Sequence, residues 1–386
     1  MSIGSALAAG NEPLPRLAKE ALAQALEKSG ASHATSVLLF LTSDFSRHAQ
    51  RTVTAVARAA RCTEVAGGIA AGVFTDHGWI LDRPAAAVMV FAGGLSLDHR
   101  QPAAPAGQGG AEGDDDHAGD ESEQGSEPLL SYAGSSFPCA WRDLAPRRFG
   151  GSFAGSLGRR DPVAWQHSRL AWECSLRLRG AHVDLGVSTG WRLLGRPFPV
   201  DSCRDYELFS LGGKSALDSL TRALPAACRD PLQLPLASLC AVVTDGRGEG
   251  ADDSWHTIAI LAANADKSLT LAERTTPGQN LAWATRVPQS AEDDMRQSLS
   301  RLAGVAADPV AALVFSCIGR GACFHSGQDR ELDCLRERFP GLPLIGGYGT
   351  GQIAPRAAGG NRLLHNAVVT ALISMTTRRA DVQSQP

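Results

Sequence analysis

Two segments near opposite ends of the chain follow the same pattern, and this internal similarity restricts the fold more than any other feature. VLLFLTSDF (37–45) and ALVFSCIGRG (312–321) each begin a series of apolar run, helical pattern, glycine-rich segment and second apolar run. When the two series are aligned, Gly67-Gly68 matches Gly346-Gly347, and both copies read GG-x-x-x-G. Such self-similarity is typical of a duplicated structural unit. The sequence predicts an α+β protein made of two related mixed-sheet domains, arranged pseudo-symmetrically after an internal duplication.

The spacing of apolar residues places helices and strands within these copies. Short apolar runs with β-branched residues predict buried strands, and apolar residues three or four apart predict helices. Gly30 follows the first helical pattern and suits a helix C-terminus. The expected helices are 15–28, 51–61, 214–224, 290–302 and 329–339, and the expected strands include 37–41, 85–91, 239–243, 257–262, 281–287, 311–316, 342–345 and 366–373. Glycine turns are expected after the strands that precede Gly67 and Gly346.

The length of 386 residues favours two domains. We expect an N-terminal domain at 1–195, a C-terminal domain at 196–376 and a flexible tail at 377–386. Residues 101–128 hold eight carboxylates without Lys or Arg, among many Gly, Ala, Pro and Ser residues. A segment of this composition buries little apolar surface, so we expect a disordered acidic insertion there.

Charge and cysteine content suggest the cellular setting. Without the eight carboxylates of 101–128, the formal net charge of −3 becomes +5, spread thinly along the sequence. No run of Arg and Lys suggests phosphate binding, so we expect no nucleic-acid partner. The nine cysteines form no CxxC pair, which favours reduced thiols. The first residues do not resemble a signal peptide, and no apolar run has the length of a membrane helix. The expected location is the cytoplasm, without membrane insertion.

Several segments together resemble the FIST family. ALVFSCIGRG (312–321) and PLIGGYGTGQIAP (343–355) resemble the C-terminal FIST signature, in which a Cys-x-Gly-Arg-Gly loop is followed by a glycine-rich segment. GWRLLGRPFPV and GQNLAWATRVPQSAEDD resemble the segments that precede this signature, and VAGGIAAGVF resembles part of the N-terminal FIST domain. One departure is Gln352, where many relatives carry Glu. The resemblance extends over most of the chain outside the acidic insertion.

The resemblance implies a sensory protein for small ligands, rather than an enzyme, that acts in signal transduction. It also implies a small polar ligand, such as an amino acid or another carboxylate. A signalling protein would act as partner in trans, with a histidine kinase or a cyclic-di-GMP enzyme as candidates. Some similar proteins are haem-based nitric-oxide sensors, so haem remains an alternative cofactor. Otherwise we expect neither a cofactor nor a metal.

The loop after the last buried strand contains the main candidate for ligand binding. Arg320 lies between Gly319 and Gly321, which leave its guanidinium room to turn inward and grip a carboxylate. The alternative is that Arg320 pairs with an internal carboxylate or caps backbone carbonyls. Tyr348, Thr350 and Gln352 lie on the second glycine turn and would line the same pocket or face solvent. The predicted ligand-binding residues are Cys317, Gly319, Arg320, Gly321, Tyr348, Thr350 and Gln352.

Four other interpretations are weighed against ligand binding. Cys317 would be a catalytic nucleophile if a base such as His325 lay within hydrogen-bond reach. Cys317, Cys323, His325 and Cys334 fall within 18 residues but lack the paired spacing of structural zinc sites. A haem sensor would need an axial histidine, and none of the ten stands out. A purely structural scaffold would have no ligand pocket.

Overall fold

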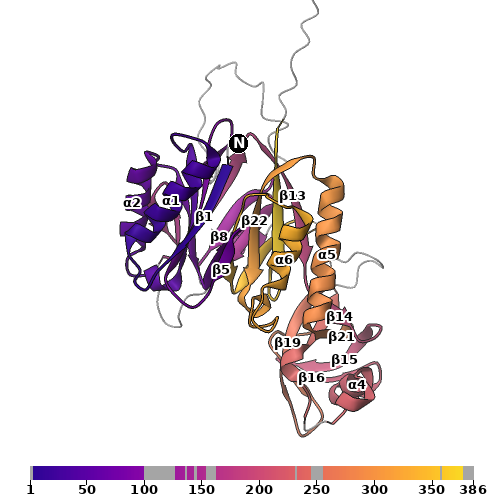
Figure 1. The fold of residues 1–386 in the computed structure, drawn as a ribbon. Coiled ribbons are helices and arrows are strands. Elements are labelled where there is room, and N and C mark those ends of the chain that lie inside the picture. Colours follow the sequence, from indigo (N-terminus) through magenta and orange to yellow (C-terminus); the bar gives the residue numbers. More distant parts are fainter. Residues whose placement is uncertain are drawn as a thin grey trace, which may run out of the picture.

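The computed structural model describes residues 3–99, 127–134, 137–142, 146–153, 162–230, 233–244, 255–356 and 359–376. The predicted tail 377–386 and the predicted insertion, apart from Glu127 and Pro128, lie outside these ranges. Three six-stranded sheets form the body of the protein, and a separate barrel projects from it (Figure 1). Mixed sheets and helices occur together, so the predicted α+β class is confirmed.

The first sheet has the strand order β1-β6-β2-β3-β10-β11, and two helices lie on its outer face (Figure 1). All seven residues of β2 are buried. A strand that is apolar throughout is typical of a sheet covered on both faces. The first helix begins at a proline and ends at Gly30, whose φ of 67° suits glycine. The elements are β1 (Ile3–Ala9), α1 (Pro15–Ser29), β2 (Ser36–Thr42), η1 (Ser43–Phe45), α2 (Ala49–Ala60), β3 (Val65–Ala70), β6 (Ala85–Phe91), β10 (Ala164–Gln166) and β11 (Arg169–Ala171).

The second sheet has the order β7-β12-β8-β9-β24-β25. Its strands come from the middle of the chain and from a C-terminal hairpin. The elements are β7 (Ser96–His99), β8 (Leu129–Ala133), α3 (Cys139–Arg142), β9 (Arg148–Ser152), β12 (Glu173–Arg179), β24 (Gly351–Pro355) and β25 (Asn361–Leu364).

The third sheet has the order β13-β26-β22-β23-β4-β5. Helices α5 and α6 cover its outer face, on the opposite side of the body from α1 and α2 (Figure 1). The elements are β4 (Gly72–Thr75), β5 (Gly78–Ile80), β13 (Ala181–Ser188), α5 (Pro288–Val305), β22 (Pro309–Cys317), η5 (Ile318–Arg320), α6 (Arg330–Arg338), β23 (Leu344–Gly349) and β26 (Val368–Met375).

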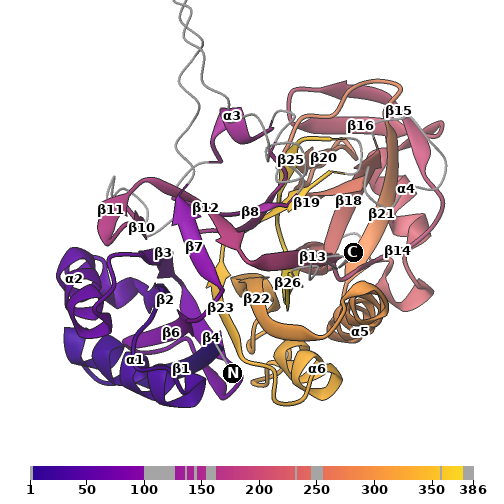
Figure 2. The same ribbon diagram turned by 90° about the horizontal axis from the view of Figure 1, so that it is seen from above.

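The three sheets share one plan, whereas the sequence predicted two related copies. In each sheet the third and fourth strands are parallel, and every other neighbouring pair is antiparallel. Three units, the segments 3–91, 96–179 and 181–375, supply the first four strands of the first, second and third sheets. The last two strands of each sheet form a hairpin that another unit supplies. The first unit gives β4–β5 to the third sheet, the second gives β10–β11 to the first, and the third gives β24–β25 to the second. Figure 2 shows the three sheets around a common centre.

Paired glycines and three aromatic rings occupy equivalent places where the sheets meet. Gly67-Gly68, Gly150-Gly151 and Gly346-Gly347 lie opposite β2, β8 and β22 in the same register. These pairs lie inside strands, so the predicted glycine turns are wrong. A β-carbon on the first glycine of each pair would overlap a carbonyl oxygen of the neighbouring strand, so only glycine fits.

The aromatic rings belong to Phe40, Tyr132 and Phe315. Their centroids lie 5.6, 5.9 and 6.4 Å apart, within the range of favourable aromatic pairs. The second glycine of a pair faces the ring of another unit, as Gly68 faces Tyr132 and Gly151 faces Phe315. The apolar core that includes these rings is continuous across all three sheets.

The barrel is a closed ring of strands inserted into the third unit. Its order is β21-β15-β16-β20-β19-β18, and β18 pairs with β21 to close the ring. It has its own apolar core, covered by α4, whose N-cap Ser215 accepts a hydrogen bond from the backbone N–H of Asp218 at 3.2 Å. The elements are β14 (Trp191–Leu193), β15 (Phe198–Arg204), β16 (Glu207–Leu211), β17 (Lys214–Ser215), α4 (Ala216–Ala223), η2 (Ala226–Cys228), η3 (Leu236–Ser238), β18 (Leu239–Thr244), β19 (Trp255–Ala263), β20 (Leu269–Leu271) and β21 (Asn280–Arg286).

The predicted division at residue 195 remains a prediction about folding units, and the sheets cross it. Strand β13 lies before the division but pairs with β26 after it. Strand β4 likewise pairs with β23. Within the described ranges, none of the helices has the length and apolar character needed to span a membrane.

Candidate functional site

The predicted ligand loop lies where the barrel joins the body. The chain passes between the two at residues 188–191 and again at 286–288, and we call these two crossings the neck. The loop leaves the buried strand β22 at Cys317 and continues as the short turn η5. A β-carbon on Gly190 would lie 2.7 Å from the guanidinium carbon of Arg320, so the loop packs directly against the neck.

Arg320 is buried, with 1% of its surface exposed, and protein acceptors use all five of its N–H donors. Its Nε donates to Glu331 Oε1 at 2.7 Å. Its Nη1 donates to the carbonyls of Ser188 and Asn366 at 2.7 and 3.4 Å. Its Nη2 donates to Ser188 Oγ at 2.8 Å and to the Ala291 carbonyl at 3.3 Å. A ligand can therefore reach this guanidinium only by displacing one of these acceptors, and the predicted anchor role requires that displacement.

The same network ties the neck to helix α5. Ser188 Oγ donates to Asp294 Oδ2 at 2.7 Å, and the backbone N–H of Gly190 donates to the same oxygen at 2.8 Å. Asp294 thus holds both ends of the first crossing. The barrel and the body are joined here by hydrogen bonds that converge on Arg320 and Asp294.

Glu331 balances the charge of Arg320 and leaves one carboxylate oxygen without a partner. Its Oε1 lies 2.7 Å from Arg320 Nη2 and 3.2 Å from His325 Nε2. Its Oε2 is buried and has no hydrogen-bond partner among the residues that the structure describes. Glu331 also lines an internal cavity of about 10 Å³, together with Ser316 and Asp329. A cavity of this size holds about one water molecule, so it cannot take a larger ligand.

Tyr348 and Asp329 form a second buried pair beside this network. The Tyr348 hydroxyl donates to Asp329, whose other oxygen accepts from the backbone N–H of Leu332 at the start of α6. Burial raises the pKa of the Asp329 carboxyl above its usual value, and burial next to Asp329 raises the pKa of Tyr348. The Tyr348 ring also packs against Gly321, so the loop and the glycine-rich strand are in contact.

A guanidinium that the sequence analysis did not single out lies beside the loop. Arg286 ends β21, and its Nη2 lies 3.8 Å from the position that a β-carbon on Gly319 would take. Cys317 Sγ and Asn366 Oδ1 lie 3.7 and 3.0 Å from the same point. Arg286 is half-buried, contacts the Phe324 ring at 5.9 Å, and makes no hydrogen bond or ion pair with another described residue. Burial lowers the pKa of this guanidinium below its usual value.

Thr350 and Gln352 contact residues 365–367, the segment that also contacts Cys317 and Arg320. Both follow β23 into the second sheet, where β24 pairs with β9. The Thr350 backbone N–H donates to the Ser152 carbonyl at 2.9 Å. Gln352 is fully buried, and its Oε1 accepts from the backbone N–H of Ala367 at 3.4 Å. The structure therefore brings Cys317, Gly319, Arg320, Gly321 and Tyr348 together, and Thr350 and Gln352 meet the same segment 365–367 from the second sheet.

The groups that the rival readings need are engaged elsewhere. Cys317 Sγ contacts Asn366 Oδ1 at 3.8 Å, whereas His325 Nε2 contacts Glu331. His325 is the buried histidine among those whose side chains are described, and its Nε2 lies 3.2 Å from Glu331 Oε1. Within the described ranges, no three His, Cys, Asp or Glu residues are grouped to hold a metal ion.

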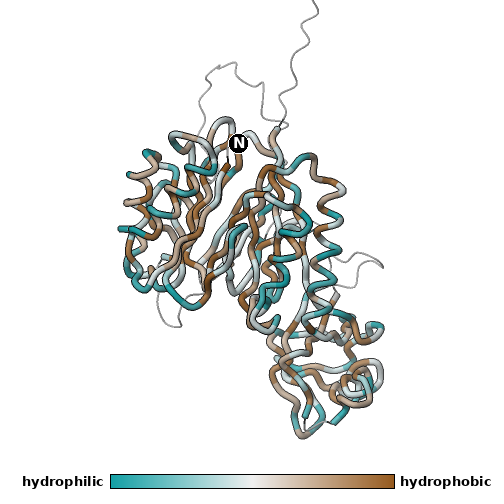
Figure 3. The backbone as a smooth tube through the Cα atoms, viewed as in Figure 1, coloured by the Kyte–Doolittle hydropathy of each residue, from teal (hydrophilic) through white to brown (hydrophobic). Residues whose placement is uncertain are grey.

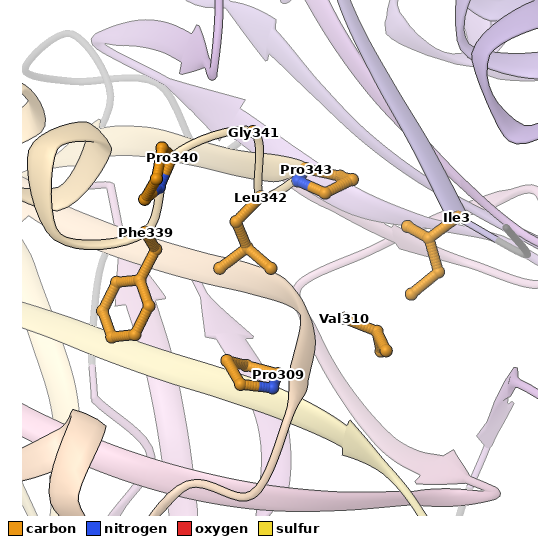
Figure 4. Close-up of a pocket in the computed structure, with 8 residues that line it drawn as sticks. All are labelled: Ile3, Pro309, Val310, Phe339, Pro340, Gly341, Leu342 and Pro343. Atoms are coloured by element: carbon orange, nitrogen blue, oxygen red, sulfur yellow. The ribbon is translucent and has the colours of Figure 1, made fainter.

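The structure also contains other cavities. Figure 4 shows a pocket of about 370 Å³ between β1 and the turn that follows α6. Its lining is apolar, with Ile3, Val310, Phe339 and Leu342 among the side chains, and it has no charged group to fix a polar ligand. A cavity of about 280 Å³ at the barrel end is lined by Trp283 and α4.

Comparisons with known proteins identify one matching family and several relatives. The FIST C domain family matches residues 216–355, from α4 to the end of β24. An uncharacterized protein of Mycobacterium tuberculosis H37Rv is 28% identical over 205 residues, covering 49% of this chain and 50% of the relative. An uncharacterized protein of Mycobacterium bovis is 27% identical over 194 residues, covering 49% and 50%. The chain thus spans about half the length of the curated relatives it matches. The match supports a relation to the FIST family over the C-terminal segment.

Proposed function

We propose that this chain is a small-ligand sensor of the FIST type, which binds a small carboxylate at the neck and passes the signal to a partner in trans. The proposal extends the FIST relation from residues 216–355 to the whole chain. It places the protein in the cytoplasm, without catalytic activity of its own. An amino acid is the favoured ligand class, and a histidine kinase or a cyclic-di-GMP enzyme is the favoured partner class.

The single observation that carries the proposal is the state of Arg286. The half-buried Arg286 guanidinium makes no hydrogen bond with another described residue, so its donors are available to a ligand. A carboxylate ligand would offer two oxygens to the planar fork of donors. Arg286 Nη2 lies 3.8 Å from the position that a β-carbon on Gly319 would take, next to the Asn366 amide. We therefore assign the anchor role to Arg286 and a positioning role to Arg320.

Arg320 and Asp294 would transmit occupancy to the barrel. Both hold the first neck crossing through Ser188, while Arg286 lies on the second. A ligand that draws Arg286 toward Gly319 would change the second crossing relative to the first. In this proposal the orientation of the barrel against the body is the output that the partner reads.

The experiment is a screen of amino acids and short carboxylic acids by thermal shift, followed by calorimetry on any ligand found. We expect Arg286→Gln to weaken binding about tenfold to a hundredfold, because one charge-assisted hydrogen bond is worth about 1.5 to 3 kcal/mol. Arg192→Gln is the matched control, since this exposed arginine lies on the neighbouring strand β14. Equal affinities in the two variants would refute the anchor role of Arg286. A wild-type protein that responds to none of the compounds would refute the proposed ligand class.

A further inference from the structure

A groove on the side of the body opposite the neck is lined by positively charged residues that lie far apart in the sequence. It lies between α1, α2 and β11 and has a volume of about 860 Å³. Five exposed cations line it: Arg16, Lys19, Arg47, Arg51 and Arg58. No carboxylate is among its lining residues. Figure 3 shows hydrophilic residues along the outer faces of these two helices.

None of these five side chains has a hydrogen bond or an ion pair with another residue in the described part of the chain. Some exposed cations elsewhere do form ion pairs, as in Arg179 with Asp98 and Arg296 with Glu337. Five like charges around one groove repel each other unless an anion neutralises them. The groove is therefore arranged for a ligand that carries several negative charges.

The wall of the groove is fixed by hydrogen bonds before any ligand binds. Gln50 Nε2 donates to the Ser168 carbonyl at 2.9 Å, and Gln50 Oε1 accepts from the backbone N–H of Leu170 at 3.0 Å. These bonds hold α2 against the edge hairpin of the first sheet. A preformed wall lowers the entropy that binding must overcome.

The helix ends add to the charge of the side chains. Strands β1 and β2 both run antiparallel to β6, so they are parallel to each other, and α1 and α2 both begin at the same edge of the sheet. Neither helix has a side-chain N-cap or an acidic residue in its first turn. The backbone N–H groups in their first turns, which Pro15 at the start of α1 lacks, thus favour anions at the same end of the strands.

We propose that this groove binds a small soluble ligand with two or more phosphate groups, independently of the carboxylate site at the neck. Two or more phosphates fit the number of cations and their distribution over both helices. The lining contains no Phe, Tyr or Trp on which a nucleobase could stack. Recognition therefore rests on the phosphates, and the rest of the ligand contributes little.

Calorimetry with inorganic pyrophosphate, ADP and orthophosphate tests the proposal on the full chain. We expect pyrophosphate and ADP to bind at least about tenfold more tightly than orthophosphate, since they can engage cations on both helices. Adenosine should not bind. Because the cations are exposed, raising NaCl from about 0.05 to 0.5 M should weaken binding strongly.

The variant Arg51→Glu combined with Arg58→Glu should weaken pyrophosphate binding at least about tenfold. Arg301→Glu, an exposed change on α5, is the matched control and should leave binding unchanged. If the double variant does not fold, as judged by circular dichroism, Arg16→Ala and Arg47→Ala replace it.

Absence of pyrophosphate binding at low salt would overturn the proposal. So would equal weakening by Arg301→Glu. Binding of a single-stranded oligonucleotide or of phosphatidylinositol-phosphate vesicles without binding of pyrophosphate or ADP would also overturn it, in favour of a macromolecular or membrane surface. None of these results depends on Arg286, so the two sites can fail separately.

Discussion

The buried pair of Arg320 and Glu331 offers the sharpest test of how the neck is held. The change Glu331→Gln keeps the shape of the side chain and one acceptor oxygen but removes its charge. Arg320 is 1% exposed, so its guanidinium would remain buried without a counter-charge. Removing one partner of a buried pair costs about 3 to 5 kcal/mol. Because an amide oxygen can still accept one hydrogen bond, we expect a loss of about 3 kcal/mol in the free energy of unfolding.

Urea unfolding followed by circular dichroism measures this loss. With a slope of about 2 to 3 kcal/mol per M urea, the midpoint should fall by about 1 M or slightly more. Asp98→Asn is the control, because the Arg179–Asp98 pair has side chains 66% and 40% exposed. Such a surface pair contributes less than about 1 kcal/mol. Equal losses in the two variants would refute the view that Arg320 depends on Glu331 for its burial.

Three further predictions concern titration, thiol reactivity and the acidic segment. Burial raises the pKa of Asp329, so the folded state binds this proton more tightly than the unfolded state, and the stability that this group contributes falls as the pH rises above about 4. Urea unfolding between about pH 4 and 7 should show a smaller decline in stability for Asp329→Asn than for the wild type. An identical decline would contradict the assignment. Burial raises the pKa of Cys174 and Cys240 to about 12, so these thiols should react slowly. Brief iodoacetamide treatment followed by mass spectrometry should find the exposed cysteines labelled first, which are Cys139, Cys228 and Cys323. Deleting residues 101–126 should leave the melting temperature nearly unchanged, because their composition contributes few side chains to a core. Deleting residues 101–128 should lower the melting temperature slightly, because the 2.6 Å contact between Glu127 and His182 is lost. A large drop in melting temperature for the shorter deletion would contradict this prediction.

Much of the secondary structure could be predicted because apolar periodicity reports burial directly. The buried strands β2, β6 and β22 and the helices α1, α5 and α6 lie within a few residues of their predicted bounds. The α+β class followed from these elements. The closed barrel could not be predicted in the same way, since its closure depends on the pairing of β18 with β21, about 40 residues apart.

The number of equivalent units was missed although the sequence contains the signal. GGSFAG (150–155) repeats the GG-x-x-x-G pattern a third time. The acidic segment before it interrupts the strand and helix pattern that made the other two copies visible. The glycine pairs were also assigned to turns, because close backbone approach within a sheet and a tight turn both select glycine.

The sequence located the loop of the candidate site, but it did not identify which side chain would donate hydrogen bonds to a ligand there. The Gly-Arg-Gly pattern identified the loop. The burial of Arg320 against Glu331 could not be predicted, because it depends on how α6 is oriented toward the loop. Arg286 carried no local motif and became visible only beside Gly319. The groove cations were dispersed over 43 positions, although Arg51 and Arg58 are seven residues apart in the predicted helix 51–61 and so share one face.

The exchange of hairpins among the three units determines which fragments of this protein can fold on their own. A fragment bounded by residues 216 and 355 would contain β22 and β23 but lack β13, β26 and β4. Both edges of the remaining pair would then expose unpaired backbone N–H and C=O groups, which invite pairing with other chains. Such a fragment should aggregate on expression even though it carries the recognisable family segment. Only the full chain closes the cycle, in which each sheet is completed by its neighbour.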